Sequence, residues 1–300
     1  MHLLITGGTG FIGERLTEAL LAQEHTVTVL TRQSRSGRAT LNYVQSLDEI
    51  ASDTQLDAAI NLAGASLAAR RWSPAYKREI VNSRLGTTRA LLTLFKRLQA
   101  PPATLLSASA IGYYGHQDDT VLAEDAPVNS GFSSQLCHDW EQAAEHATEL
   151  GVRVCLLRLG VVMDSGGGAL QEMSRSFGLG VASWMGRGDQ WLSWVHRADV
   201  VRAMLFLLYN DALSGAFNFT APEPVTAKDF ALALKEHYRT LVTAGVPAVV
   251  MRVALGEMAQ ELLLNGQRVV PARLLAAGFE FSHPHITGAL QAIYSNKTWP

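Results

Sequence analysis

The chain has 300 residues, of which 48% are hydrophobic, and its 25 basic and 27 acidic side chains leave a formal net charge of −2. This length can bury one large core. The near-neutral charge excludes the basic surface of nucleic-acid binders, so we expect no nucleic-acid partner. The basic residues are 20 arginines and only 5 lysines, namely Lys77, Lys96, Lys228, Lys235 and Lys297.

Cysteine usage favours a reducing, cytoplasmic location. Cys137 and Cys155 are too few for a disulfide framework or a zinc cluster. His283 and His285 have no partners at metal-ligand spacing, so we expect no metal. The first residues lack the basic leader and cleavage site of a secretory signal. Charged residues interrupt every long apolar region, so we also expect no membrane partner.

In the first half of the chain, short apolar segments alternate with segments of helical spacing. Strands are expected at 3–6, 26–30, 57–63, 103–109 and 152–157, and helices at 11–23, 74–98 and 132–150. Such alternation predicts an α/β fold, in which helices cover both faces of a parallel sheet.

Composition changes after Val162, because glycines and tryptophans gather over 163–195. We expect loops and a short strand there, on the ligand side of the sheet. The next expected elements are a helix at 196–208, a strand at 216–220 and a helix at 226–238 begun by a threonine cap. The stretch 246–299 is helix-rich. The prediction is a doubly wound, Rossmann-like domain over 1–222 and a smaller C-terminal lobe over 223–300.

A glycine-rich turn follows the first strand and opens the first helix. It contains the spacing Gly-x-Gly-x-x-Gly of dinucleotide-binding loops. Glycines let backbone N–H groups approach a pyrophosphate, and the helix N-terminus adds partial positive charge. A turn without a ligand would use the same residues, but the strand before it and the helix after it favour a dinucleotide. The expected contacts are Gly7, Thr9, Gly10, Phe11, Ile12 and Gly13.

The end of the second strand indicates which dinucleotide binds. Chains that bind NAD usually carry an acidic residue there, which holds the ribose 2′-OH. Here Thr31, Arg32 and Arg35 follow the strand, and no carboxylate does. Guanidinium groups match phosphate geometry, which favours the 2′-phosphate of NADP(H) over ordinary solvated arginines.

The other strands of a parallel sheet should end at the same crevice. Their ends add three groups of candidate contacts. These are Leu62, Ala63 and Gly64 after the third expected strand, Ser109 after the next, and Gly160 after the last.

Several segments together resemble the extended short-chain dehydrogenase/reductase family of nucleotide-sugar epimerases and dehydratases. They are TGGTGFIG (6–13), NLAG (61–64), SASAIGYYG (107–115), LRLGVV (157–162) and GRGDQWLSWVHRADVV (186–201). The run RRW (70–72) and the tail that begins LGEMAQELLL are similar to the YfcH-like subgroup. The resemblance covers nearly the whole chain. It implies an oxidoreductase or epimerase with Ser109 as the active-site hydroxyl, and with Glu79 and Arg84 on a helix that faces the cofactor.

The family acts through a Tyr-x-x-x-Lys pair, in which the phenol exchanges a proton and the lysine holds the nicotinamide ribose. Ser133 stands at the tyrosine position and Cys137 at the lysine position. No tyrosine occurs over 115–208 and no lysine over 97–227, so no shift of register restores the pair.

Three explanations of the missing pair stay open. Tyr113 or Tyr114 could supply a displaced phenol, or both could pack in a loop. Cys137 could be a redox or nucleophilic thiol, or a small buried side chain near the cofactor ribose. The protein could also bind NADP(H) as a sensor or structural module with little turnover.

Substrate contacts are expected beside the cofactor. Arg70 and Arg71 could clamp an anion, or they could be solvated next to a packing tryptophan. We expect one tryptophan of 163–195, Trp191, to contact the ligand. His196 could face the substrate or serve the entry of its helix. The sequence thus predicts NADP(H)-dependent hydride transfer on a small substrate, with Ser109 on the reacting oxygen and the oligomeric state open.

Overall fold

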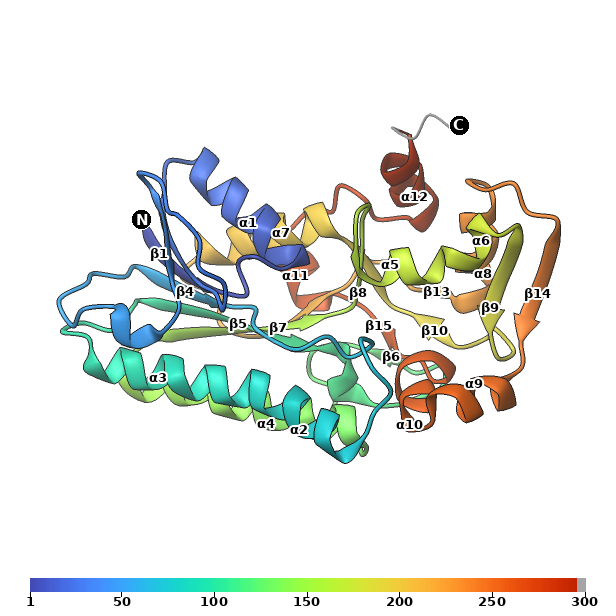
Figure 1. Cartoon of the computed structure of the whole chain (residues 1–300), viewed down its shortest axis with the longest axis horizontal. Coiled ribbons are helices and arrows are strands. Elements are labelled where there is room, and N and C mark those ends of the chain that lie inside the picture. Colours follow the sequence, from blue (N-terminus) through green and yellow to red (C-terminus); the bar gives the residue numbers. More distant parts are fainter. Residues whose placement is uncertain (296–300) are drawn as a thin grey trace.

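The computed structural model describes residues 1–295, and its centre is a seven-stranded sheet in which all neighbouring strands are parallel. The strands lie in the order β12-β7-β5-β4-β1-β2-β3. Their bounds are β1 (His2–Thr6), β2 (Thr26–Leu30), β3 (Leu41–Val44), β4 (Ala58–Asn61), β5 (Thr104–Ala110), β7 (Arg153–Leu159) and β12 (Gly215–Phe219). Because the chain starts in the sheet and winds toward both edges, the predicted doubly wound, Rossmann-like α/β fold is confirmed (Figure 1).

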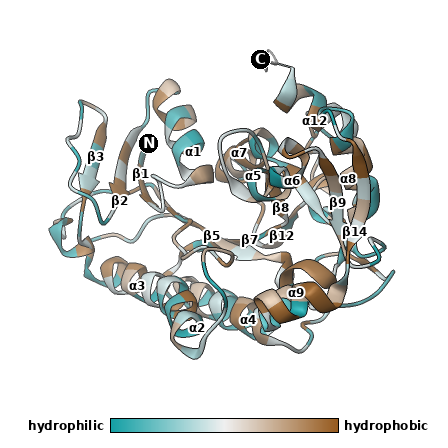
Figure 2. Ribbon diagram, turned by 45° about the vertical axis from the view of Figure 1, so that its right-hand side comes forward, coloured by the Kyte–Doolittle hydropathy of each residue, from teal (hydrophilic) through white to brown (hydrophobic). Residues whose placement is uncertain are grey.

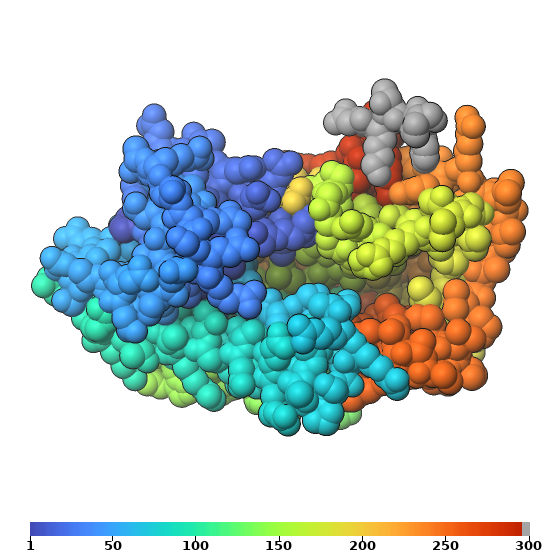
Figure 3. Space-filling view, in the orientation of Figure 1, coloured from blue at the N-terminus to red at the C-terminus, as the bar shows by residue number. Residues whose placement is uncertain are grey.

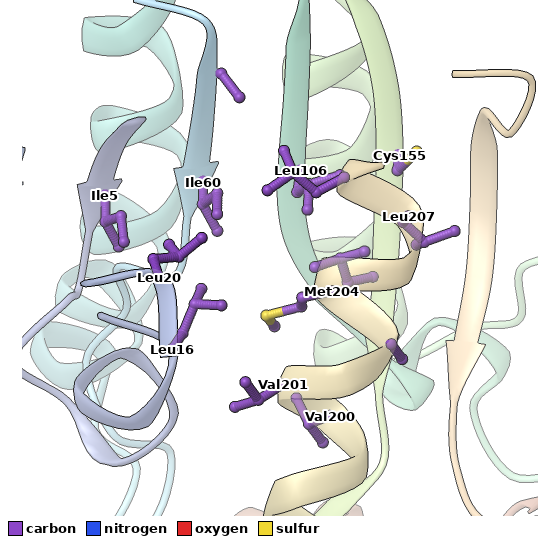
Figure 4. Packing of buried hydrophobic residues seen from close by; sticks show 14 of the residues in the cluster. Ile5, Leu16, Leu20, Ile60, Leu106, Cys155, Val200, Val201, Met204 and Leu207 are labelled. Carbon is purple, nitrogen blue, oxygen red and sulfur yellow. The ribbon is translucent and has the colours of Figure 1, made fainter. Parts of the chain in front are cut away.

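Helices cover both faces of this sheet (Figure 2). One face carries α1 (Phe11–Ala22) and α7 (Arg197–Leu208), and the other carries α2 (Pro74–Val81), α3 (Thr87–Arg97) and α4 (Phe132–Glu145). Figure 4 shows Leu16 of α1 and Met204 of α7 packed with Ile5 and Leu106 of the strands, and all four are fully buried. The strands read as continuous apolar runs because both of their faces are buried in this way.

Two separate stretches of the chain build the lobe on the ligand side of the sheet. The first holds β8 (Val161–Met163), α5 (Gly168–Met173), α6 (Arg175–Gly178), β9 (Val181–Met185), β10 (Trp191–Leu192) and β11 (Trp194–His196). The second holds β13 (Val225–Thr226), α8 (Ala227–Lys235), β14 (Val242–Val246), α9 (Ala248–Leu255), α10 (Glu257–Ala259), β15 (Arg268–Val269), α11 (Ala272–Ala276) and α12 (Ile286–Tyr294). The stretches are paired, since β14 runs parallel to β9 and β13 antiparallel to β10.

The lobe also joins the larger domain. β15 runs parallel to β6 (Val121–Leu122), which follows the end of β5. A separate apolar cluster lies between the two stretches of the lobe. Phe177 and Trp194 come from the first stretch, and Phe230 and Leu290 come from the second. The predicted boundary at residue 222 therefore falls between two stretches that pack against each other.

Several elements differ from the sequence prediction. The stretch 163–195 holds two short helices besides its strands, and the edge strand β3 was not expected. The expected helix at 74–98 is divided by a π-helical turn at Asn82–Gly86, and that at 132–150 ends in 3-10 turns. The threonine cap is confirmed, since Thr226 Oγ1 accepts a hydrogen bond from Asp229 N. The last expected helical residues, up to Trp299, lie outside the described residues. No helix within 1–295 is long and apolar enough to cross a membrane.

A buried carboxylate fastens the C-terminal region to α7. Asp199 is fully buried, and its two oxygens accept backbone hydrogen bonds from Ser282 (2.8 Å) and His283 (2.9 Å). Arg202 on the next turn donates a third bond of 3.0 Å to the same carboxylate. The side chain therefore satisfies two backbone donors of a distant segment and is itself paired.

Replacing this carboxylate should destabilise the fold. Asp199→Ala leaves two backbone N–H groups without their acceptor, and we expect it to lower the free energy of unfolding by about 2–4 kcal/mol. Urea denaturation monitored by circular dichroism measures the change. The control is Asp211→Ala, whose side chain is 94% exposed in its pair with Arg153, and which should change stability by less than about 0.5 kcal/mol. Equal effects of the two variants would contradict the role of Asp199.

Candidate active site

The carboxyl ends of the central strands border two adjoining hollows, which we call the outer groove and the inner cavity. The outer groove has a volume of about 1000 Å³ and runs from the loop after β1 past the end of β2 to α2. The inner cavity has a volume of about 560 Å³ and runs from the same loop past the ends of β5 and β7 to the C-terminal lobe. Both hollows border Gly7, Gly10, Ala63 and Gly64, so they form one continuous site. Figure 3 shows a hollow between the blue N-terminal part and the yellow-green segment after β8.

The loop after β1 has the close backbone packing that glycine alone permits. A Cβ atom on Gly13 would lie 2.2 Å from the carbonyl oxygen of Gly7, and one on Gly7 would lie 2.6 Å from that of Leu62. Gly7 also has a φ of +70°, which L side chains rarely adopt. Among the described residues, no side chain caps α1, whose N-cap is Gly10. The first-turn N–H groups of α1 therefore remain available to an anion in the site.

Most residues predicted for the cofactor line this site. Those at the outer groove are Gly7, Thr9, Gly10, Thr31, Arg32, Leu62, Ala63, Gly64 and Glu79. Those at the inner cavity include Phe11, Ile12, Gly13, Arg84, Cys137 and Gly160. Arg35 is not among the lining residues, because its guanidinium donates to Gln33 (3.0 Å) and lies over the ring of Tyr43.

Ser109 lies at the end of β5 and is held by a buried ion pair. Its hydroxyl donates to Glu141 Oε1 at 2.6 Å, and Arg158 donates to both oxygens of that carboxylate at 2.8 Å. Both charged side chains are about 5% exposed. Burial opposes the charge of the guanidinium, but the hydrogen bonds and charge of Glu141 outweigh it and raise the pKa of Arg158. This cluster fixes the hydroxyl of Ser109 at the wall of the inner cavity.

The two tyrosines after Ser109 lie on the far side of this ion pair. Tyr114 is fully buried, and its hydroxyl donates to Asn218 (2.7 Å) and accepts from Arg158 (2.8 Å). Burial raises the pKa of Tyr114 to about 12. The ring of Tyr113 packs on the guanidinium of Arg158, whose carbon lies 3.6 Å from the ring centroid. Neither tyrosine is among the described residues that line the two hollows, so the structure does not bring the proposed phenols to Ser109.

The positions of the missing pair do face the inner cavity. Ser133 and Cys137 lie on successive turns of α4 and both line it. The hydroxyl of Ser133 is buried without a hydrogen-bond partner among the described residues. Burial raises the pKa of the Cys137 thiol to about 12, and the nearby charge of Glu141 acts in the same direction.

Arg84 places a positive charge at the wall of the inner cavity. It belongs to the π-helical turn between α2 and α3, and its guanidinium donates to the carbonyl oxygens of Ala65 (3.1 Å) and Ile80 (3.2 Å). Burial lowers the pKa of Arg84 from its usual value, while the thiolate of Cys137 would raise it. Arg84 lines the same cavity as Cys137, the position where the family keeps its lysine.

Two of the four predicted substrate contacts, Trp191 and Arg70, line the site. Trp191 lines the inner cavity, with its ring under Arg268 and its N–H donating to Asp119 (2.8 Å). Arg70 lines the outer groove, 3.8 Å from the carboxylate of Glu79.

Arg71 and His196 are absent from the described lining of both hollows. Arg71 lies near Gly256. His196 is buried and caps α7 by accepting from Ala198 N at 3.1 Å, and it stacks on His283. Its placement fits the structural role that the sequence left open.

The sequence did not single out five residues of the C-terminal lobe that line the inner cavity. They are Glu261, Leu262, Asn265, Gly266 and Gln267. They follow α10 in a π-helical turn and the loop before β15. The pairing of β15 with β6 helps to bring this stretch to the ends of β5 and β7, and no local motif indicates it.

Comparison with known proteins decides the family. Residues 3–219 match the NAD dependent epimerase/dehydratase family, and residues 246–293 match a domain of unknown function, DUF1731. This chain belongs to the NAD-dependent epimerase/dehydratase family. The resemblance read from the sequence motifs is thus confirmed.

Relatives of this family member match along the full length. Epimerase family protein Mb2239 of Mycobacterium bovis is 40% identical over 288 residues, which is 95% of each chain. Epimerase family protein SAR0825 of Staphylococcus aureus is 35% identical over 97% of this chain and 98% of its own. The human epimerase family protein SDR39U1, whose crystal structure contains NADPH, has a TM-score of 0.90 at 32% identity and covers 99% of this chain and 100% of its own.

The burial of both thiols predicts low reactivity in the folded protein. Burial raises the pKa of Cys137 to about 12 and of Cys155 to about 11. Since only thiolates react, labelling by iodoacetamide should be about 1,000-fold slower at Cys137, and about 100-fold slower at Cys155, than in urea-unfolded chain. Mass spectrometry of timed samples measures both rates. Fast labelling of native Cys137 would favour the nucleophilic or redox thiol over the structural one.

Proposed function

We propose that this family member is an NADP(H)-dependent oxidoreductase of the epimerase type. It would move a hydride between the nicotinamide and a carbinol carbon of a small sugar- or nucleotide-sugar-like substrate. The observation that carries the proposal is the continuity of the site, because the inner cavity joins the glycine-rich loop directly to the hydroxyl of Ser109. The NADPH of the human relative supports the same cofactor here.

The residues of the outer groove suit the phosphates of this cofactor. The uncapped N-terminus of α1 and the glycine-rich loop would hold the pyrophosphate. Arg32 lines the groove beside Thr31 at the end of β2, where it would pair with the 2′-phosphate. The orphaned hydroxyl of Ser133 and the cation of Arg84 line the inner cavity, where the nicotinamide end would lie. When bound, the nicotinamide supplies the hydride chemistry.

Ser109 would hold the reacting oxygen of the substrate. A hydroxyl has one proton to donate, and rotation about its Cβ–Oγ bond directs that proton either at Glu141 or into the cavity. Arg158 neutralises the carboxylate, so Ser109 is oriented without an uncompensated buried charge beside the substrate. We propose further that the lobe formed by 163–195 and 223–295 selects the substrate, since its residues close the cavity opposite the loop after β1.

Cofactor binding with little turnover is a second candidate function. The specific observation in its favour is the pair Ser133 and Cys137, because neither side chain can replace the phenol and the lysine of the family. A sensor or structural module would bind NADPH tightly and leave sugars, nucleotide sugars and small carbonyls unchanged. Steady hydride exchange with any of these compounds would contradict it.

The proposed 2′-phosphate contact predicts selective loss of NADPH. Arg32→Ala should weaken NADPH about 10- to 100-fold, because a charge-assisted hydrogen bond is lost, and should leave NADH nearly unchanged. Isothermal titration calorimetry with both dinucleotides measures the effect. The matched control is Arg38→Ala, an exposed arginine that does not line the groove. Equal weakening of NADPH and NADH would remove the 2′-phosphate from the role of Arg32.

The proposed role of Ser109 predicts a loss of rate without a loss of cofactor. Ser109→Ala should lower kcat about 100-fold or more, as removal of a donor to the reacting oxygen does elsewhere, and should keep the Kd of NADPH within about twofold. Ser109→Thr keeps a hydroxyl and should retain most of the rate. Turnover that Ser109→Ala leaves unchanged would exclude Ser109 from the mechanism.

A further inference from the structure

Hydride transfer to or from a carbinol carbon also needs a group that exchanges the hydroxyl proton. Three ionisable side chains line the inner cavity within the described part of the chain, namely Arg84, Cys137 and Glu261. A guanidinium keeps its proton in proteins. The buried thiol of Cys137 keeps its proton too, since its pKa lies near 12. Of these three lining side chains, the carboxylate of Glu261 is left as the proton acceptor.

The carboxylate contacts the residue at which the family keeps its phenol. Glu261 Oε2 accepts a hydrogen bond from the backbone N–H of Ser133 at 3.3 Å. Its other oxygen approaches the N-cap residue Gly131, where an added Cβ would lie 2.8 Å from Oε1. The carboxylate therefore lies at the N-terminus of α4. It is half-buried and borders the same cavity as Ser109.

Contacts on both sides hold the segment that carries Glu261. Before it, Glu257 of α10 pairs with Lys77 of α2 at 2.5 Å. After it, the side-chain amide of Gln190 donates to the carbonyl oxygen of Leu263 at 2.8 Å. The backbone that carries Glu261 is thus held on one side by Lys77 of α2 and on the other by Gln190. The C-terminal lobe thus brings to the cavity a carboxylate that no ion pair among the described residues neutralises in the way that Arg158 neutralises Glu141 of α4.

We infer that Glu261 is the proton-transfer residue of the inner cavity, an inference that rests on the proposed function. In the oxidation of a substrate alcohol, the C–H bond breaks and its electron pair goes with the hydride to the oxidised nicotinamide. The O–H proton passes to the carboxylate of Glu261, and the oxygen electrons form the carbonyl bond. In the reverse direction the carboxylic acid returns the proton to the carbonyl oxygen as the hydride arrives. Ser109 holds that oxygen in both directions.

The test uses the full-length protein loaded with NADP(H), with glucose and UDP-glucose as alcohol probes and glyceraldehyde as a carbonyl probe. Glu261→Gln keeps an oxygen that can accept from Ser133 N–H but removes the base. It should lower kcat about 100- to 10,000-fold. The Kd of NADPH and the thermal midpoint should stay unchanged, which separates proton transfer from folding and from cofactor binding. Glu280→Gln, an exposed change in the same lobe, is the matched control and should keep the full rate.

Two further readouts distinguish a base from a structural carboxylate. The pH profile of the oxidation rate should differ between the wild type and Glu261→Gln, although Arg84, Cys137 and the Lys77–Glu257 pair stay in place in both. Added formate should restore part of the rate of Glu261→Ala. A full rate in Glu261→Gln would overturn the inference and leave the proposed function standing. A wild-type protein that binds NADPH but converts none of the three probes would instead overturn the proposed oxidoreductase, and the role of Glu261 with it.

Discussion

The buried ion pair between Glu141 and Arg158 is the constraint on which the site depends. It joins α4 to β7, and through Ser109 it reaches the end of β5. Its second side contacts Tyr114, whose hydroxyl lies between Arg158 and Asn218 of β12. Removing one partner of such a pair leaves an uncompensated charge in the core and costs about 3–5 kcal/mol. The pair therefore has two effects. Glu141 orients the hydroxyl of Ser109 at the cavity, and Arg158 holds the phenol of Tyr114 away from it.

The sequence predicted the parts of the molecule whose causes are local. The central strands were predicted from apolar runs, which arise because both faces of the sheet are buried. The loop after β1 was predicted from its glycine spacing, and its backbone contacts leave no room for a Cβ at Gly7 or Gly13. The prediction of Arg32 as a phosphate contact rests on the absence of a carboxylate beside it, and the residue lines the outer groove. The short helices α5 and α6 were missed because glycine-rich stretches carry no helical apolar pattern. The π-helical turn that divides α2 from α3 has no local signal either, and it is this turn that carries Arg84.

The site was less predictable, since its residues meet only through tertiary contacts. Tyr113 and Tyr114 follow Ser109 by four and five residues, yet the 3-10 turn after β5 directs them toward Arg158 and away from the cavity. Glu261 follows Ser109 by about 150 residues and reaches the cavity because β15 pairs with β6. A search limited to the window of the missing pair could not find it. A sequence motif identifies catalytic residues only when they lie near one another in the chain. Here the positions of the missing tyrosine and lysine are on α4, whereas the proposed replacement, Glu261, is in the C-terminal lobe.

The pairing of β15 with β6 has a consequence for the order in which the protein forms. Its register joins Arg268 to Val121, so the contact closes a loop of nearly half the chain. Contacts of such sequence separation form late and slow the folding of a domain. The central sheet and the glycine-rich loop can therefore form before the stretch that carries Glu261 packs against them. In that order, the glycine-rich loop exists before the inner cavity is closed.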